Sequence, residues 1–258
     1  MNLSLWYIAR ETFTLLRRDK IFAPFIIVTI LVTAIANLAS DWAIEDFTKI
    51  LFDFGAFGYH VTGTLVAIMW GTKTLIDSRS QGSVETQLAS PVSRPTWLIG
   101  KFLGLAFALL TLAVAFIAIW QLVMFLNRYG MMGKPEILMF AFLTLDWLVM
   151  GAVAICFAST MSSAVSLFAA CTLWVVGMAA PSVAQLLSPE TPLITRTLVE
   201  GIARFWNLQQ FNLVDAVASL GSFPSPRDLE MRLGYGFCLI AVFLTIGSWS
   251  FSKRDLGQ

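Results

Sequence analysis

Residues 102–127 read FLGLAFALLTLAVAFIAIWQLVMFLN, an uncharged run of 26 residues between Lys101 and Arg128. An α-helix rises about 1.5 Å per residue, and about 20 apolar residues cross the hydrocarbon core of a bilayer. This run is therefore long enough to span a membrane. The whole chain has the same character, since 57% of its 258 residues are hydrophobic and only 13% are charged. A soluble domain of this length could not bury so much apolar side chain.

Similar apolar runs divide the rest of the chain. We expect six membrane-spanning helices, at about 21–40, 54–73, 98–127, 137–159, 164–187 and 233–252. The fourth and fifth share one uncharged stretch of 43 residues, which the polar cluster STMSS at 159–163 divides with a tight turn. Backbone groups that face lipid must be satisfied within their own segment, so every span is helical. The predicted fold class is all-α, a polytopic membrane protein with a six-helix transmembrane domain over residues 21–258.

Lysine and arginine predict the orientation in the membrane. Ten of them lie at the amino end, in the loop between the second and third spans, and at the carboxyl end, whereas seven lie in the other loops. Short loops rich in basic residues stay in the cytoplasm. We therefore expect both termini to be cytoplasmic in a bacterial inner membrane. No small-residue cleavage site ends the first apolar run, so no cleavable signal peptide is expected.

The first 20 residues predict an amphipathic helix that lies in the membrane interface. Its two faces follow helical spacing. The apolar face consists of Leu5, Trp6, Ala9, Phe13 and Leu16, and the polar face of Arg10, Glu11, Thr14, Arg17 and Arg18. Arginines on such a helix point toward lipid phosphates, and Trp6 suits the interface.

The loop between the second and third spans reads DSRSQGSVETQLASPVSRPTWLIGK from Asp77 to Lys101. Residues 77–90 predict a short polar helix, because the residue before Pro91 is biased away from helical geometry. Glu85 lies beside the apolar side chain of Leu88 on this helix. A short helix joined tightly to two spans can fit a groove on a soluble partner and transmit force. We interpret it as a coupling helix on the cytoplasmic side.

This loop resembles that of the type-2 class of ABC exporter permeases. The residues that match are Gly82-Ser83, Glu85, Leu88, Ser90, Pro91, Ser93-Arg94 and Gly100-Lys101. Asp77 stands one position early for the leading acid of the pattern, and Arg79 follows where an acid is common. The resemblance implies that Asp77, Gly82, Glu85, Leu88, Pro91 and Arg94 contact the ATPase. Within the class, the chain is most similar to permeases that serve maturation of multicopper enzymes such as nitrous oxide reductase.

The resemblance implies a permease subunit that couples ATP hydrolysis to export. The chain has no G-x-x-x-x-G-K-[ST] phosphate loop, so we expect no enzymatic activity and an ABC ATPase as a separate subunit that binds the ATP. The other expected partners are a second permease chain, with which this chain would form a homodimer, and membrane lipids. No cofactor, metal or nucleic acid is expected. The alternative is a mechanical coupler, which transmits ATPase motion to a periplasmic partner without moving a solute.

Two ionisable residues lie at membrane depth. Asp146 falls near the middle of the fourth span, where a carboxyl group marks a functional site by default. It is either hydrogen-bonded between helices, with Thr144 nearby, or part of a pathway or coupling device. His60 lies in the second span, nearer its outer end, and is expected to donate to a carbonyl, with a role as a ligand or proton relay as the alternative. Lys73 ends that span and is expected to extend to the interface.

The outer loop at 188–232 is the longest. Ile194, Leu198 and Ile202 recur at helical spacing and predict a short half-inserted helix. Aromatic residues that suit the interface are Phe205, Trp206, Phe211 and Phe223. The loop either gates an exit or docks a periplasmic partner, or it serves as an interfacial cap.

Overall fold

The computed structural model describes residues 3–41, 47–80, 93–126, 130–187, 191–218 and 223–252. Within these ranges the chain forms helices and no strand, so the all-α class is confirmed. The helices are α1 (Leu3–Arg17), α2 (Phe22–Asp41), α3 (Phe47–Ser80), α5 (Arg94–Leu126), α6 (Lys134–Ala158), α7 (Ser163–Gln185), α8 (Leu193–Phe205), η1 (Gln209–Phe211), α9 (Val214–Ala218) and α10 (Pro226–Ser252).

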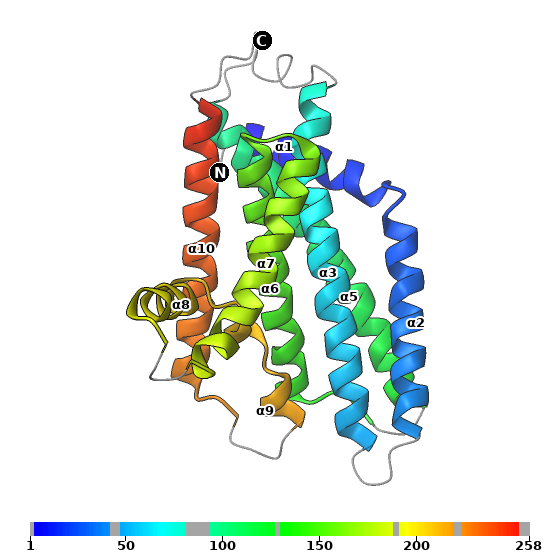
Figure 1. Ribbon diagram of the computed structural model, residues 1–258. Coiled ribbons are helices and arrows are strands. Elements are labelled where there is room, and N and C mark those ends of the chain that lie inside the picture. Colours follow the sequence, from blue (N-terminus) through cyan, green and yellow to red (C-terminus); the bar gives the residue numbers. More distant parts are fainter. Residues whose placement is uncertain are drawn as a thin grey trace.

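Four of these helices, α5, α6, α7 and α10, are long and apolar enough to cross a membrane. Helix α2 has a shorter apolar stretch, Ala23–Leu38. Helix α3 is the longest at 34 residues, but polar side chains interrupt its apolar sequence. Both run alongside the other long helices in Figure 1. The described residues thus establish a polytopic helical protein, while the count of six spans stays a prediction.

Several helices extend beyond the apolar runs that predict them. Helix α3 continues without a break to Ser80, so 77–80 prolong the second span instead of beginning a separate element. Helix α10 begins at Pro226, seven residues before the predicted start of its span. Proline is well suited to a first helical turn, where its missing N–H has no partner to lose. Outside the hydrocarbon core a helix can continue through charged residues. The length of an apolar run therefore underestimates the length of its helix.

Helix α6 is the centre of the bundle. In its most apolar window 78% of the residues are buried, against 22% in α7 and 17% in α10. It packs against α3, α10, α5 and α7, while α2 packs on the outside of α3. Helix α6 ends at Ala158 and α7 begins at Ser163, so the two helices meet at the polar cluster 159–163.

Glycines allow the helices around α6 to approach closely. A Cβ atom at Gly63 of α3 would lie 1.8 Å from the indole ring of Trp147. One at Gly71 would lie 2.8 Å from Ala154, and one at Gly236 of α10 would lie 2.6 Å from Leu145. Packing through small residues is typical of helices in membranes, where the solvent gives no hydrophobic drive to association.

Helix α1 lies across one end of the bundle, where α3 ends, α5 begins and α10 ends (Figure 1). We call this the loop end, because the segment 81–92 connects α3 to α5 there. Helix α8 lies crosswise beside α7 and α10, toward the opposite end.

Helix α1 (Leu3–Arg17) lies within the segment predicted to form the amino-terminal amphipathic helix, but its buried face differs from the prediction. Ile8 and Ala9 are buried against α5, whereas Trp6 is 50% exposed. Gly100 and Gly104 of α5 make this contact close, since Cβ atoms there would meet Ile8 and Thr12 within 3 Å. The helix is therefore part of the packed bundle along one face.

Candidate functional site

A histidine and a carboxylate meet between α3 and α6. Nε2 of His60 lies 2.6 Å from Oδ2 of Asp146, the geometry in which the ring nitrogen donates to the carboxylate. Thr64 donates its hydroxyl to the same oxygen at 3.4 Å. The side chain of Asp146 is fully buried and that of His60 is 8% exposed. The described residues supply no partner for the second oxygen, Oδ1 of Asp146.

A second hydrogen bond lies one residue away along the same contact. Thr144 donates its own proton to the carbonyl of Phe140, so the hydroxyl of Tyr59 donates to Thr144, at 2.5 Å. The ring of Tyr59 lies 4.1 Å from that of Trp147, measured between centroids. We call this contact, with His60, Thr64 and Asp146, the α3–α6 seam. Hydrogen bonds between buried partners fix one register of the two helices.

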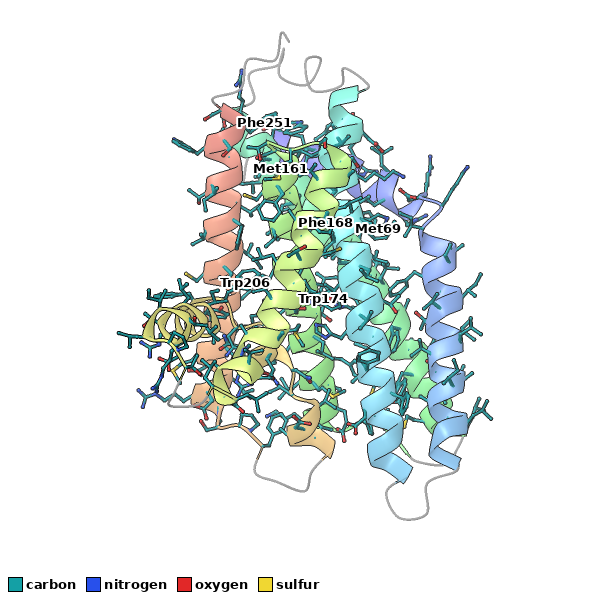
Figure 2. The ribbon with its side chains drawn as sticks, viewed as in Figure 1. Met69, Met161, Phe168, Trp174, Trp206 and Phe251 are labelled. Carbon is teal, nitrogen blue, oxygen red and sulfur yellow. The ribbon has the colours of Figure 1, made fainter. Side chains whose placement is uncertain are left out.

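The seam is closed by aromatic side chains. Trp174, labelled about midway along α7 in Figure 2, presents its ring edge-on to His60 at 5.8 Å. Trp147 is fully buried over Gly63. A buried polar group without a hydrogen-bond partner lowers the stability of the fold by about 1–3 kcal/mol. The hydrogen bonds of the seam avoid this cost for the side chains that make them.

The seam corrects three predictions. His60 has the carboxylate of Asp146 as its partner and not a backbone carbonyl. The two side chains lie at one depth, whereas the sequence placed His60 nearer the outer face. Thr144 bonds to Phe140 and Tyr59, and the threonine on Asp146 is Thr64.

A signal for the common depth of the two residues was present in the sequence, although not for their contact. His60 stands 13 residues before Lys73, and Asp146 stands 13 residues before Ser159. Because each end marker lies at the same side of the predicted membrane, both side chains lie about 20 Å below it. Nothing in the sequence distinguished Tyr59, Thr64 and Trp147, because tyrosine, threonine and tryptophan are common in membrane helices.

Of the six predicted ATPase-contacting residues, the structure describes two, and both lie at the loop end. Gly82, Glu85, Leu88 and Pro91 fall within 81–92 and so lie outside the described residues. Asp77 lies in the last turns of α3, and Arg94 is the first residue of α5. The two described members of the set therefore flank the segment on either side.

Arg94 joins the start of α5 to the end of α10. Its guanidinium donates to the carbonyls of Phe251, at 3.3 Å, and Ser252, at 2.8 Å. The ring of Trp97 stacks on that of Phe251 with centroids 5.3 Å apart, at the loop end in Figure 2. A cation at the carboxyl end of a helix is favourable, because the last carbonyls of the helix carry partial negative charge.

Lys73 joins α3 to the corner between α1 and α2. Its Nζ lies 2.5 Å from Oδ2 of Asp19, and Oδ1 of Asp19 accepts the N–H of Ile21 at 3.1 Å. Lys73 therefore pairs with a carboxylate instead of only extending to the interface, and α3 continues past it. Both helices that lead into 81–92 are thus anchored to a neighbouring element.

Lys101 is buried beneath α1, with 2% of its surface exposed. Its ammonium group lies 5.3 Å from the ring centroid of Trp97, a cation–π contact. It borders a hollow of about 670 Å³ between α1, α3 and α5, which Glu11, Lys73 and Asp77 also line. The hollow carries both signs of charge and reaches the last turns of α3.

The described part of the predicted outer loop at 188–232 contains helix α8, where the sequence predicts a short helix. Its apolar residues Ile194 and Leu198 are exposed. Trp206 and Phe211, expected at the interface, are buried instead. Nε1 of Trp206 donates to the carbonyl of Leu173 at 2.7 Å, so this residue, labelled in Figure 2, holds the segment against α7. Sequence alone does not separate an interfacial aromatic residue from one that packs.

The described residues contain no group of three or more histidine, cysteine or acidic side chains that could hold a metal ion. The cysteines Cys156, Cys171 and Cys238 are free thiols.

These features define a polytopic helical membrane protein with a hydrogen-bonded core, in which α3 and α5 are each anchored to a neighbouring element. A family model described as ABC-2 family transporter protein matches residues 28–256. The chain therefore belongs to the ABC-2 transporter family. No curated protein matches it. The resemblance to type-2 ABC permeases is confirmed at this level, and the grouping with enzyme-maturation permeases stays a prediction.

Proposed function

We propose that this chain is the permease subunit of an ABC export system, driven by ATP hydrolysis in a separate ATPase subunit. The observation that carries the proposal is the anchoring of both helices that lead into 81–92. Lys73 holds α3 to the α1–α2 corner, and Arg94 holds α5 to α10. Displacement of the loop by an ATPase would therefore move a set of helices and not a single one.

The seam extends this path into the bilayer. Helix α3 is bonded to the central helix α6 through His60 and Asp146, about 20 Å from Lys73 along the helix axis. Packed helices transmit displacement because their interiors have little free volume. In this mechanism the loop is the input, and α6 is where the motion reaches the middle of the bundle.

The chain itself has no phosphate loop, so the mechanism assigns ATP to the partner and no catalytic group to this subunit. The second permease chain would contact surfaces that the bundle leaves open. Gly151 and Ala113, which would suit a close contact, are already buried within the chain. Helices α7 and α10 carry exposed apolar residues such as Phe168, Val175 and Phe237, which a second chain could cover.

The alternative, a coupler that acts on a periplasmic partner, rests on α8. This helix has no buried residue among those described, and Leu193, Ile194 and Phe205 are each more than 70% exposed. It lies toward the end opposite the loop, where a periplasmic protein would bind in the predicted topology. An adjacent gene for a periplasmic repeat protein would favour this alternative.

The test of the proposal is purification of the chain in mild detergent, with identification of its partners by mass spectrometry. We expect an ABC ATPase to co-purify, and its ATP hydrolysis to rise when the permease is added. A chain that captures no ATPase, from cells that express the neighbouring genes, would contradict the proposal.

The predicted orientation has its own test. A reporter that is active only in the periplasm should stay silent when it is fused after Gln258. An active reporter at that position would show that the carboxyl end is outside, and the same fusion after Phe205 should be active.

A further inference from the structure

A groove runs between α1 and α5 on the side of α1 away from the charged hollow. Its volume is about 780 Å³. Phe107, Leu110 and Val114 of α5 form its apolar side, and each is more than 40% exposed. Trp6 of α1 closes one edge, because its ring meets that of Phe107 edge-on at 5.9 Å.

The opposite side of the groove is cationic. It is lined by Arg10 and Arg17 of α1 and by Arg18, which directly follows this helix. The lining includes no carboxylate. None of the three takes part in an ion pair with another described residue. The neighbouring hollow, which Arg18 also borders, differs, because there Glu11, Asp19 and Asp77 balance the basic residues, so Arg10 and Arg17 are the arginines that line the groove alone. The groove is thus a place where positive charge lies uncompensated beside an apolar wall.

The two sides are arranged along the membrane normal. Val114 lies 13 residues beyond Lys101 on α5, which is about 20 Å toward the bilayer interior. Helix α1 crosses α5 near Gly100 and Gly104, at the end where charges begin. The arginines therefore lie at headgroup level, and the apolar wall runs along the first part of an acyl chain.

We propose that this groove is a binding site for one anionic phospholipid. The phosphate-bearing headgroup is held by Arg10 and Arg17, and an acyl chain lies against Leu110 and Val114. Arginine binds phosphate oxygens through paired N–H donors, which a zwitterionic headgroup satisfies less well because its own cation competes. A soluble anion would occupy the arginines but leave the apolar wall uncovered. Bound lipid would fix α1 on α5 and so stiffen the loop end.

The test uses the purified full chain in detergent, with dioleoyl phosphatidylglycerol or dioleoyl phosphatidylcholine added and native mass spectrometry as the readout. The wild-type chain should retain one phosphatidylglycerol molecule in preference to phosphatidylcholine. The double variant R10Q/R17Q should bind it about 30-fold more weakly, which corresponds to about 2 kcal/mol. The control R204Q/R227Q removes two exposed arginines elsewhere and should bind as the wild type does.

A second pair of variants tests the apolar wall without changing charge. V114W fills the groove and should abolish retention of phosphatidylglycerol, whereas V175W, at a similarly exposed valine of α7, should not. Equal retention by R10Q/R17Q and its control, or equal retention of both lipids by the wild type, would overturn the proposal. Displacement of the lipid by excess inorganic phosphate would also overturn it, because it would indicate a soluble-anion site.

Discussion

The α3–α6 seam and the loop end both carry polar and charged side chains, but they arrange them in opposite ways. In the seam, His60 and Asp146 are buried and bonded to each other. At the loop end, Lys73 is 43% exposed and the arginines of α1 face outward. Polar groups in the seam hold two helices in one register. At the loop end the side chains of Lys101 and Asp19 are buried, but Lys73 and the arginines remain accessible, and this is the end where we propose that the ATPase and a lipid bind.

The largest expected effect comes from disrupting the close approach within the seam. Gly63→Val places side-chain atoms where the buried ring of Trp147 lies. The ring has no free volume to enter, so we expect a loss of stability above about 3 kcal/mol, at the upper end for overpacked sites. Thermal unfolding in detergent would measure it. Gly234→Val is the matched control, because a Cβ there meets nothing within 4 Å.

A smaller effect is expected from breaking the polar pair. His60→Leu leaves the carboxyl of Asp146 with only the long hydrogen bond from Thr64, and should cost about 1–3 kcal/mol. The double variant H60L/D146L removes both partners and should be more stable than H60L. If the loss of stability of H60L/D146L equals the sum of the losses of H60L and D146L, the two residues do not interact.

The smallest effect on stability is expected at the loop end. Lys73→Met removes the ion pair with Asp19, which keeps its bond from the N–H of Ile21. Since Lys73 is partly exposed, we expect a loss of about 0–1 kcal/mol at low salt. The difference from wild type should shrink in high salt, where exposed charges are screened. A loss that persists unchanged in high salt would mean that packing, not charge, is responsible.

The positions of the helices along the chain could be predicted from sequence because lipid imposes a strong constraint. The apolar runs, the turn at 159–163 and the amphipathic start all correspond to helices or their ends in the structure. The predicted ends of the helices were less accurate, since α3 extends to Ser80 and α10 starts at Pro226. Hydropathy reports where lipid is, and a helix does not have to stop there.

The site was only partly predictable. His60 and Asp146 were identified because ionisable residues are rare at membrane depth. Their contact depends on which helices are neighbours, and a single sequence does not give that. Trp206 was misplaced for a similar reason, because burial of an aromatic residue depends on the elements around it.

The central claim is that an ATPase drives this chain through the segment 81–92. The direct measurement is co-elution with the ATPase, together with permease-stimulated ATP hydrolysis, for the Glu85→Lys chain. Reversing a charge at a complementary contact costs about 2–5 kcal/mol, so affinity should fall by more than about tenfold. The fold should persist, because Glu85 lies outside the apolar runs that predict the membrane spans, and Glu230→Lys on α10 should behave as the wild type does. Normal co-elution and normal stimulation with Glu85→Lys, and equally with Leu88→Asp, would contradict the account.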